Sequence, residues 1–159
     1  MLKSKHPREM FCINKTPFHV LARAVIIEQE HILLAHEKES PSTFLPGGHV
    51  EIGESVITTI ERELLEELGL KCIISAYLGA LEHSWTRDGL QQFEMNHLFK
   101  VTLMSTTPLV NPTSKEDHLE FYWVPIDELE NHNVQPYPLC EIIKVKDNIH
   151  GAWWGSTLL

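Results

Sequence analysis

The chain of 159 residues has only three cysteines, Cys12, Cys72 and Cys140, and none of them forms a CxxC pair. An odd number of widely spaced cysteines excludes a disulfide framework and offers no zinc-knuckle spacing. No run approaches the roughly 18 apolar residues of a membrane span, and the basic N-terminus lacks the apolar core of a secretion signal. We therefore expect a soluble cytoplasmic protein that does not enter a membrane.

Basic residues are also scarce. Lys and Arg number 13 against 22 Asp and Glu, which gives a formal net charge of −9 with neutral histidines. Such a surface repels a polyphosphate backbone, so long nucleic acid is excluded as a partner. A small phosphorylated substrate is not excluded, because divalent cations held by clustered carboxylates reverse the local potential where a phosphate binds.

Internal repeats and low-complexity segments are absent as well. Hydrophobic residues make up 43% of the chain, and 8 Gly and 9 Pro are ordinary numbers for a globular protein of this length. This length and apolar content suffice to close one core. The sequence predicts a single domain over residues 1–159, in which residues 1–17 form a polar leader.

Apolar periodicity and turn residues predict both strands and helices along the chain. Strands are predicted at residues 19–28, 31–36, 72–81, 91–103 and 121–124. Turns or loops are predicted at residues 29–30, 40–43, 46–48, 85–89 and 106–114. Helical segments are predicted at residues 55–68, 125–129 and 139–145. The first helix has the clearest pattern, since apolar residues recur at helical spacing and Gly69 follows its end.

Three carboxylates share one side of that helix. Glu63, Glu66 and Glu67 stand at positions i, i+3 and i+4, away from the apolar side formed by Ile60 and Leu64. By itself, such a patch is most often a solvated acidic face. The same oxygen-rich arrangement also suits Mg²⁺ or Mn²⁺.

The residues around the patch favour the metal. They fit the spacing G-x5-E-x7-R-E-U-x-E-E-x-G-U, with U a bulky aliphatic residue, at Gly48, Glu54, Arg62, Glu63, Leu64, Glu66, Glu67, Gly69 and Leu70. Chance agreement at all nine positions has odds on the order of 10⁻⁷ in a chain of this length. Residues 48–70 resemble the Nudix box, and residues 44–48 and 123–129 resemble segments that the family carries before and after it.

The resemblance implies a Nudix-type α/β/α sandwich with a mixed β-sheet. Members of the family hydrolyse nucleoside diphosphates linked to another moiety and use Mg²⁺ or Mn²⁺. In this chain, Glu66 and Glu67 would be metal ligands, Glu63 a ligand or the base that activates water, and the Gly47 carbonyl a further ligand. We expect Arg62 to orient the carboxylates, although an ordinary surface i,i+4 pair is the alternative. Glu54 would brace the loop of the box.

Several family members take one more carboxylate from a loop after the box, as a ligand or base. Glu116 best matches that place, and Glu82, Glu94 and Glu120 are its rivals. For each of them taken alone, an exposed surface acid is the simpler interpretation, since position is the only argument that a sequence offers.

Candidate substrate contacts are fewer. Phe44 and Trp85 could stack on a base or ribose, although core packing is the usual role of an aromatic residue, and His49 could contact a phosphate. Trp153 and Trp154 could cover a sheet edge or form a homodimer contact. None of the ten histidines shows HxH or HExxH spacing, which argues against zinc.

Two functions remain in competition. The first is a metal-dependent hydrolase that cleaves the pyrophosphate linkage of a nucleoside di- or triphosphate derivative, a small nucleotide-type substrate. The second is a non-catalytic nucleotide-binding or regulatory module on the same fold. The complete set of Glu63, Glu66 and Glu67 favours the hydrolase, because a binding module could lose these residues freely.

Overall fold

The computed structural model describes residues 17–107, 109–144 and 151–158. Its elements, in chain order, are β1 (Phe18–Val25), β2 (Ile27–Glu28), β3 (His31–Glu37), β4 (Thr43–Phe44), β5 (Gly47–His49), α1 (Val56–Leu68), β6 (Cys72–Arg87), β7 (Leu90–Leu103), β8 (Leu119–Pro125), the 3-10 helix η1 (Ile126–His132), α2 (Leu139–Lys144) and β9 (Trp153–Ser156). Three predictions fall partly outside the described residues: the polar leader at 1–17, the loop at 106–114 and the final helix at 139–145.

The larger sheet has five strands in the order β5-β1-β7-β6-β9. Strands β1 and β7 run parallel, as do β6 and β9, and the remaining neighbours are antiparallel. The second sheet is built around β3, which pairs antiparallel with β2, β4 and β8. The larger sheet is therefore mixed, as the sequence predicted.

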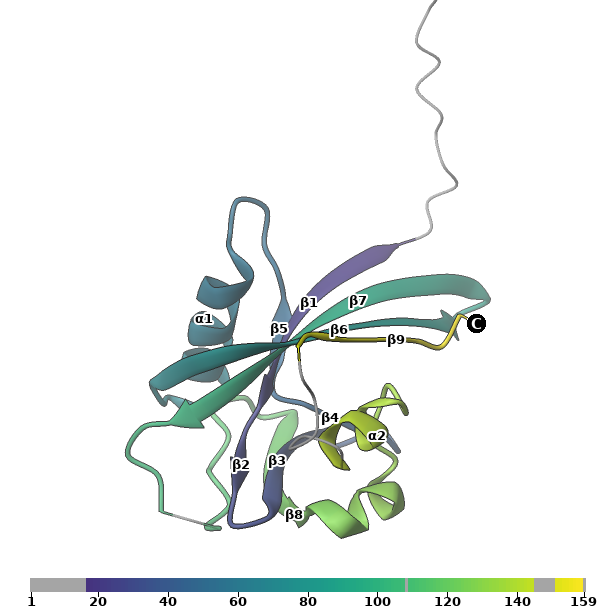
Figure 1. Ribbon diagram of the computed structural model, residues 1–159. Helices are drawn as coiled ribbons and strands as arrows, with labels where there is room; N and C mark the ends of the chain where they lie inside the picture. The colour runs from purple at the N-terminus through teal and green to yellow at the C-terminus, as the bar shows by residue number, and fades with distance from the viewer. Residues whose placement is uncertain (1–16, 108, 145–150, 159) are drawn as a thin grey trace, which may run out of the picture.

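Helices cover the two sheets from opposite sides (Figure 1). Helix α1 buries Ile60 and Leu64 in one apolar cluster with residues of both sheets, among them Phe99 and Phe121. On the other side, Leu129 of η1 and Ile142 of α2 belong to a second cluster. This arrangement confirms the predicted α/β/α sandwich. Across the described residues, no helix has the length and apolar character of a membrane span.

Helix α1 begins and ends where its capping residues stand. The Ser55 hydroxyl accepts the Thr58 N–H at 3.1 Å, and Gly69 adopts a left-handed φ of 69° from which its N–H reaches the Leu65 carbonyl at 2.9 Å. These contacts satisfy backbone groups that a helix end leaves unpaired. The predicted helix at residues 55–68 is confirmed.

The first hairpin is confirmed at its turn, where Gln29 and Glu30 have φ 46° and 59°. The predicted strand at residues 19–28 is divided, because β1 belongs to the larger sheet and only β2 pairs with β3. The predicted turn at residues 85–89 is wrong. Strand β6 continues through Arg87, and only Asp88 and Gly89 turn, at φ 52° and 76°. A two-residue turn with positive φ at both positions matches the twist of the strands, so longer pairing is possible. Trp85 therefore lies within a strand.

The C-terminal tryptophans belong to β9, which the sequence did not predict. This strand pairs with β6 at the edge of the larger sheet, and Gly79 lies directly opposite Trp153. A Cβ on Gly79 would stand 1.9 Å from the Trp153 carbonyl oxygen, so only glycine permits this approach. Of the two roles left open for Trp153 and Trp154, covering a sheet edge is the one observed.

Candidate active site

The three carboxylates of α1 differ widely in exposure. The Glu66 side chain is 52% exposed and that of Glu63 is 16% exposed, whereas Glu67 is buried at 4%. Glu67 faces β5, where the Gly47 N–H donates to its Oε2 at 3.1 Å. Glu63 packs against Gly48, since a Cβ there would stand 2.5 Å from the Glu63 carboxyl carbon. Gly48 thus lets the backbone of β5 approach the acidic side of the helix, whereas Gly47 permits the approach of β5 to β1, since a Cβ there would stand 2.2 Å from the Ala22 carbonyl oxygen.

Arg62 joins the helix to the loop of the motif. Its guanidinium donates to Glu54 at 2.9 and 3.0 Å, to Glu63 at 2.8 Å and to Glu66 at 3.0 Å, and it also reaches the His49 carbonyl at 3.0 Å. The hydrogen bonds from Arg62 lower the pKa of Glu54 to about 2. The bracing contact expected of Glu54 is present, and Arg62 contacts both carboxylates that it was expected to orient.

Glu67 is the most perturbed acid of the group. Burial raises its pKa to about 8, and the charges of Glu63 and Glu116 act in the same direction, while the Gly47 N–H and Arg23 oppose the shift. Burial also raises the pKa of Glu63. A carboxyl group that holds its proton at neutral pH becomes a carboxylate when a cation binds beside it.

The donor chemistry fits a hard divalent cation, because every candidate ligand is an oxygen and the acids repel one another. Within the part of the chain that the structure describes, no three His, Cys, Asp or Glu side chains converge to hold one ion. Glu63 and Glu66 are turned toward Arg62, and the Gly47 carbonyl accepts from Arg23 Nη1 at 2.7 Å. Binding an ion would therefore require these side chains to turn.

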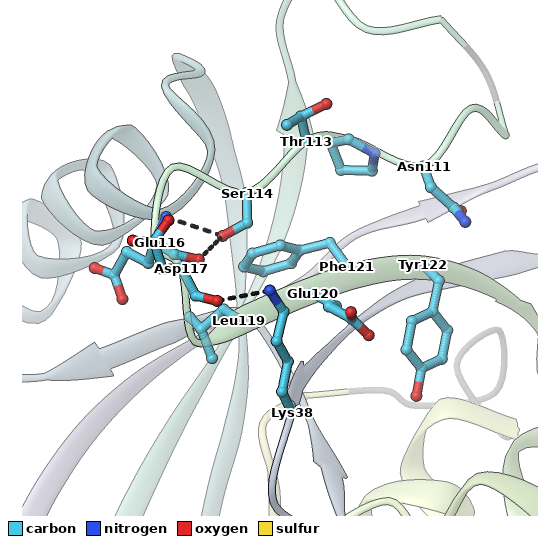
Figure 2. A pocket seen from close by; sticks show the side chains of 11 residues that line it. Lys38, Asn111, Thr113, Ser114, Glu116, Asp117, Leu119, Glu120, Phe121 and Tyr122 are labelled. Atoms are coloured by element: carbon cyan, nitrogen blue, oxygen red, sulfur yellow. Dashed lines mark hydrogen bonds between the residues drawn. The ribbon is translucent and has the colours of Figure 1, made fainter.

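Glu116 is carried to this acidic group by the loop that precedes β8. The Lys115 N–H donates to the Glu67 carbonyl at 2.7 Å, which fixes the loop to the last turn of α1. The Ser114 hydroxyl donates to the Glu116 carbonyl at 2.9 Å and accepts its N–H at 3.1 Å, as Figure 2 shows beside a cavity of about 410 Å³. The same view shows Lys38 donating to the Asp117 carbonyl.

The three rivals of Glu116 have other surroundings. Glu120 lies 3.7 Å from His36 of β3, and Glu94 accepts the Asn96 amide at 2.7 Å. Glu82 lies on β6, opposite Met95 of β7. Glu116 is close enough to Glu67 for its charge to raise the pKa of that residue.

A second cavity, of about 470 Å³, is lined by Arg23, on whose pKa the charges of Glu67 and Glu63 act, although Glu63, Glu66, Glu67 and Glu116 are not among its lining residues. Phe44 and Trp85 both line it, together with Arg23, Glu94, His83 and Gln135. His49 does not line this cavity, and its ring lies 3.0 Å from that of His19. Trp85 stacks on the rings of His19 and His83, with centroids 5.6 and 5.7 Å away. Phe44 and Trp85 thus line the same cavity, while His49 lies outside its lining and is connected to Trp85 through the ring of His19.

Sequence reasoning missed Arg23. This residue lines the cavity and also donates to the carbonyls of Leu45 and Gly47, on either side of Pro46. The sequence did contain one signal, a single charged residue inside an apolar strand. Burying a charge costs free energy of folding unless the charge has partners or a ligand.

A family model described as the NUDIX domain matches residues 17–141. The chain belongs to the Nudix family. This match covers β1 to β8, α1, η1 and the loop of Glu116, and it ends within α2, before β9.

Individual Nudix relatives match shorter segments. A putative 8-oxo-dGTP diphosphatase of Bacillus subtilis (strain 168) is 39% identical over 64 residues, which are 40% of this chain and 43% of that protein. The human 8-oxo-dGDP phosphatase NUDT18 is 32% identical over 80 residues, which are 47% of this chain and 25% of that protein. The matches thus span less than half the length of these relatives.

Solved structures give the same fold. The MutT protein from Methanosarcina mazei Go1 superposes with a TM-score of 0.65 and 20% identity, covering 84% of this chain and 96% of that one. At this identity, the likeness shows the shared Nudix fold.

Proposed function

We propose that this chain is a metal-dependent hydrolase that cleaves the pyrophosphate linkage of a nucleoside di- or triphosphate derivative. The observation that carries the proposal is a group of four acids next to a cavity-lining arginine. Glu63, Glu66 and Glu67 lie on α1 and the charge of Glu116 acts on Glu67, while the charges of Glu67 and Glu63 act on Arg23, which lines a cavity together with Phe44 and Trp85. The relatives named for 8-oxo-dGTP and 8-oxo-dGDP make oxidised guanine nucleotides the first substrates to test.

Each residue has a role in this proposal. Glu63, Glu66, Glu67 and the Gly47 carbonyl would hold Mg²⁺ or Mn²⁺, which supplies charge neutralisation at the phosphates when bound. Arg62 orients Glu63 and Glu66. Phe44 and Trp85 border the space for the nucleoside.

The reaction itself is a hydrolysis. Water attacks a phosphorus atom, the bond to the bridging oxygen breaks, and Glu116 accepts the proton of the attacking water. The products are a nucleoside monophosphate and pyrophosphate, or a phosphorylated second product for other derivatives.

A hydrolysis screen tests the proposal. Purified protein is incubated with 8-oxo-dGTP, dGTP and nucleotide sugars in Mg²⁺, in Mn²⁺ and in chelator, and the products are separated by anion exchange. We expect turnover with either metal and none with chelator. Chelator-resistant turnover would exclude the metal mechanism, and binding without cleavage across the panel would favour the non-catalytic module.

We also infer a cytoplasmic location, supported by the free thiols of Cys72 and Cys140 in the described residues. Fractionation of the native host tests this inference, and recovery of the protein outside the cytoplasm would contradict it.

A further inference from the structure

Arg23 of β1 is hydrogen-bonded on one side only. Its Nε donates to Asn96 Oδ1 at 3.4 Å, and its Nη1 donates to the Leu45 carbonyl at 3.1 Å and the Gly47 carbonyl at 2.7 Å. The two N–H groups of Nη2 have no hydrogen-bond partner among the described residues. A guanidinium has five donors in a rigid fork, so a substantial part of its binding capacity is unused.

The positive charge of Arg23 also has no carboxylate in direct contact with it among the described residues. Within the described part of the chain, no carboxylate forms an ion pair with it within 4.0 Å; the nearest link is indirect, through Asn96 to Glu94. Burial lowers the pKa of Arg23, against the attraction of Glu94, Glu67 and Glu63. Because a guanidinium stays protonated in proteins, this buried cation costs free energy unless an anion contacts it.

The unused donors have access to the cavity of about 470 Å³. Arg23 lines that cavity, and its guanidinium lies 5.2 Å from the centroid of the Phe44 ring. Among the described residues, the one enclosed side-chain polar atom without a partner is Glu28 Oε2, so Nη2 is not sealed off from solvent.

We propose that Arg23 is a substrate-binding residue that donates through Nη2 to a phosphoryl oxygen of the nucleotide. This inference rests on the proposed function, because it places the nucleotide in that cavity. Nη1 keeps its hydrogen bond to the Leu45 carbonyl while Nη2 binds the ligand. A phosphoryl oxygen suits the donor better than a neutral carbonyl, since arginine binds phosphate through charge-assisted hydrogen bonds.

The test is binding without catalysis. Wild type, Arg23→Lys, Arg23→Gln and the control Arg87→Gln are titrated in chelator with dGMP, with deoxyguanosine and with inorganic phosphate, and binding is followed by NMR. Arg87 is a suitable control because its side chain is 79% exposed and lies outside the cavity lining. Thermal melts of all four proteins report on folding.

We expect Arg23→Gln to weaken dGMP binding at least about tenfold and to leave deoxyguanosine binding unchanged. Arg23→Lys keeps the positive charge but lacks the planar guanidinium with its several donors. Its affinity for dGMP should therefore lie between those of wild type and Arg23→Gln. Inorganic phosphate should compete with dGMP for wild type and much less for Arg23→Gln. Arg87→Gln should behave as wild type. If Arg23→Gln does not fold, the test uses Arg23→Lys. The same comparison is then made between its loss of affinity for dGMP and its loss of affinity for deoxyguanosine.

Three results would overturn the proposal. Equal losses for dGMP and deoxyguanosine would assign Arg23 to the base or to the scaffold, unchanged dGMP affinity would make it purely structural, and no dGMP binding by wild type would remove the site. These titrations measure binding and not cleavage. If the hydrolysis screen found no turnover, the proposed function would be refuted, and the phosphate contact of Arg23 would still be decided by the titrations.

Discussion

Among the single residues, Glu67 has a raised pKa that makes the stability of the protein depend on pH. Its pKa of about 8 in the folded chain lies above the ordinary value of 4.5, so between these values the folded state binds a proton that the unfolded state has lost. Stability in chelator should therefore fall as pH rises through this window. The stabilising contribution is complete below about 4.5 and disappears above about 8.

Urea unfolding in chelator between pH 6.5 and 8.5 measures this slope. The histidines with lowered pKa, such as His49 and His83, add a slope of opposite sign near pH 6.5, because the unfolded chain binds protons there with the ordinary pKa of 6.5. This contribution is the same in wild type and in Glu67→Gln, so the difference between the two proteins reports on Glu67. Glu67→Gln should flatten the slope, because glutamine resembles the protonated acid. A slope shared by wild type and mutant would contradict the assignment to Glu67.

The same substitution separates metal binding from folding. In chelator at pH 8, Glu67→Gln should be as stable as wild type or more stable, because it removes a charge from the group formed with Glu63 and Glu116. In saturating Mg²⁺, wild type should be the more stable of the two proteins. The ion binds only the native state and therefore stabilises it, and it binds the mutant site more weakly. A mutant destabilised by more than about 1 kcal/mol in chelator would make Glu67 a structural residue.

Glu116 gives a second prediction at this scale. If it accepts the proton of the attacking water, Glu116→Gln should lower kcat at least about 100-fold with little change in melting temperature. Glu120→Gln is the matched control, because Glu120 lies near His36 and should keep almost full activity. Equal rates for wild type and Glu116→Gln would move the role to Glu63, Glu82 or Glu94.

At the scale of elements, the site depends on how closely β5 approaches α1. A Cβ at Gly48 would stand 2.5 to 2.7 Å from the carboxyl group of Glu63, so Gly48→Ala must displace that side chain. We expect a loss of activity of at least tenfold, on the scale of about 1.4 kcal/mol in transition-state stabilisation, with a smaller effect on unfolding. Steady-state kinetics and urea unfolding of the same preparation measure both; a fully active Gly48→Ala protein would show that Glu63 need not stay in place.

The elements also show what a sequence can and cannot reveal. Helix α1 was predictable because Ser55, the apolar spacing and Gly69 are all local signals. Strands β4 and β5 have two and three residues and exist through pairing with β3 and β1, so no local pattern marks them. The turn after β6 was predicted too long for the same reason, since pairing with β7 extends that strand through Arg87.

The candidate site follows the same division. Glu63, Glu66 and Glu67 could be grouped from helical spacing, and the motif gave Arg62 its place. The burial of Glu67 and the contacts of Arg23 arise where β1, β5 and α1 meet, which no local spacing encodes. Glu116 is one of four candidates from the sequence, and the backbone contact of Lys115 with Glu67, which joins its loop to α1, has no local signal in the sequence.

At the scale of the whole molecule, a net charge of −9 surrounds a site proposed to bind an anionic nucleotide. Two arginines, Arg23 and Arg62, lie beside the acidic group, and both already donate to protein groups. A divalent cation would therefore supply the remaining positive charge that a phosphate chain needs. We infer that the carboxylates of this Nudix chain serve to bind that cation.

The initial rate of dGTP and 8-oxo-dGTP hydrolysis in Mg²⁺ tests this inference. It is compared between wild type, Glu67→Gln and Glu61→Gln. Glu61 is exposed on the same helix, so its substitution makes the same charge change away from the site. We expect wild type and Glu61→Gln to release a nucleoside monophosphate and pyrophosphate at similar rates, and Glu67→Gln to lose at least about 100-fold. Equal rates for Glu67→Gln and Glu61→Gln would contradict the account.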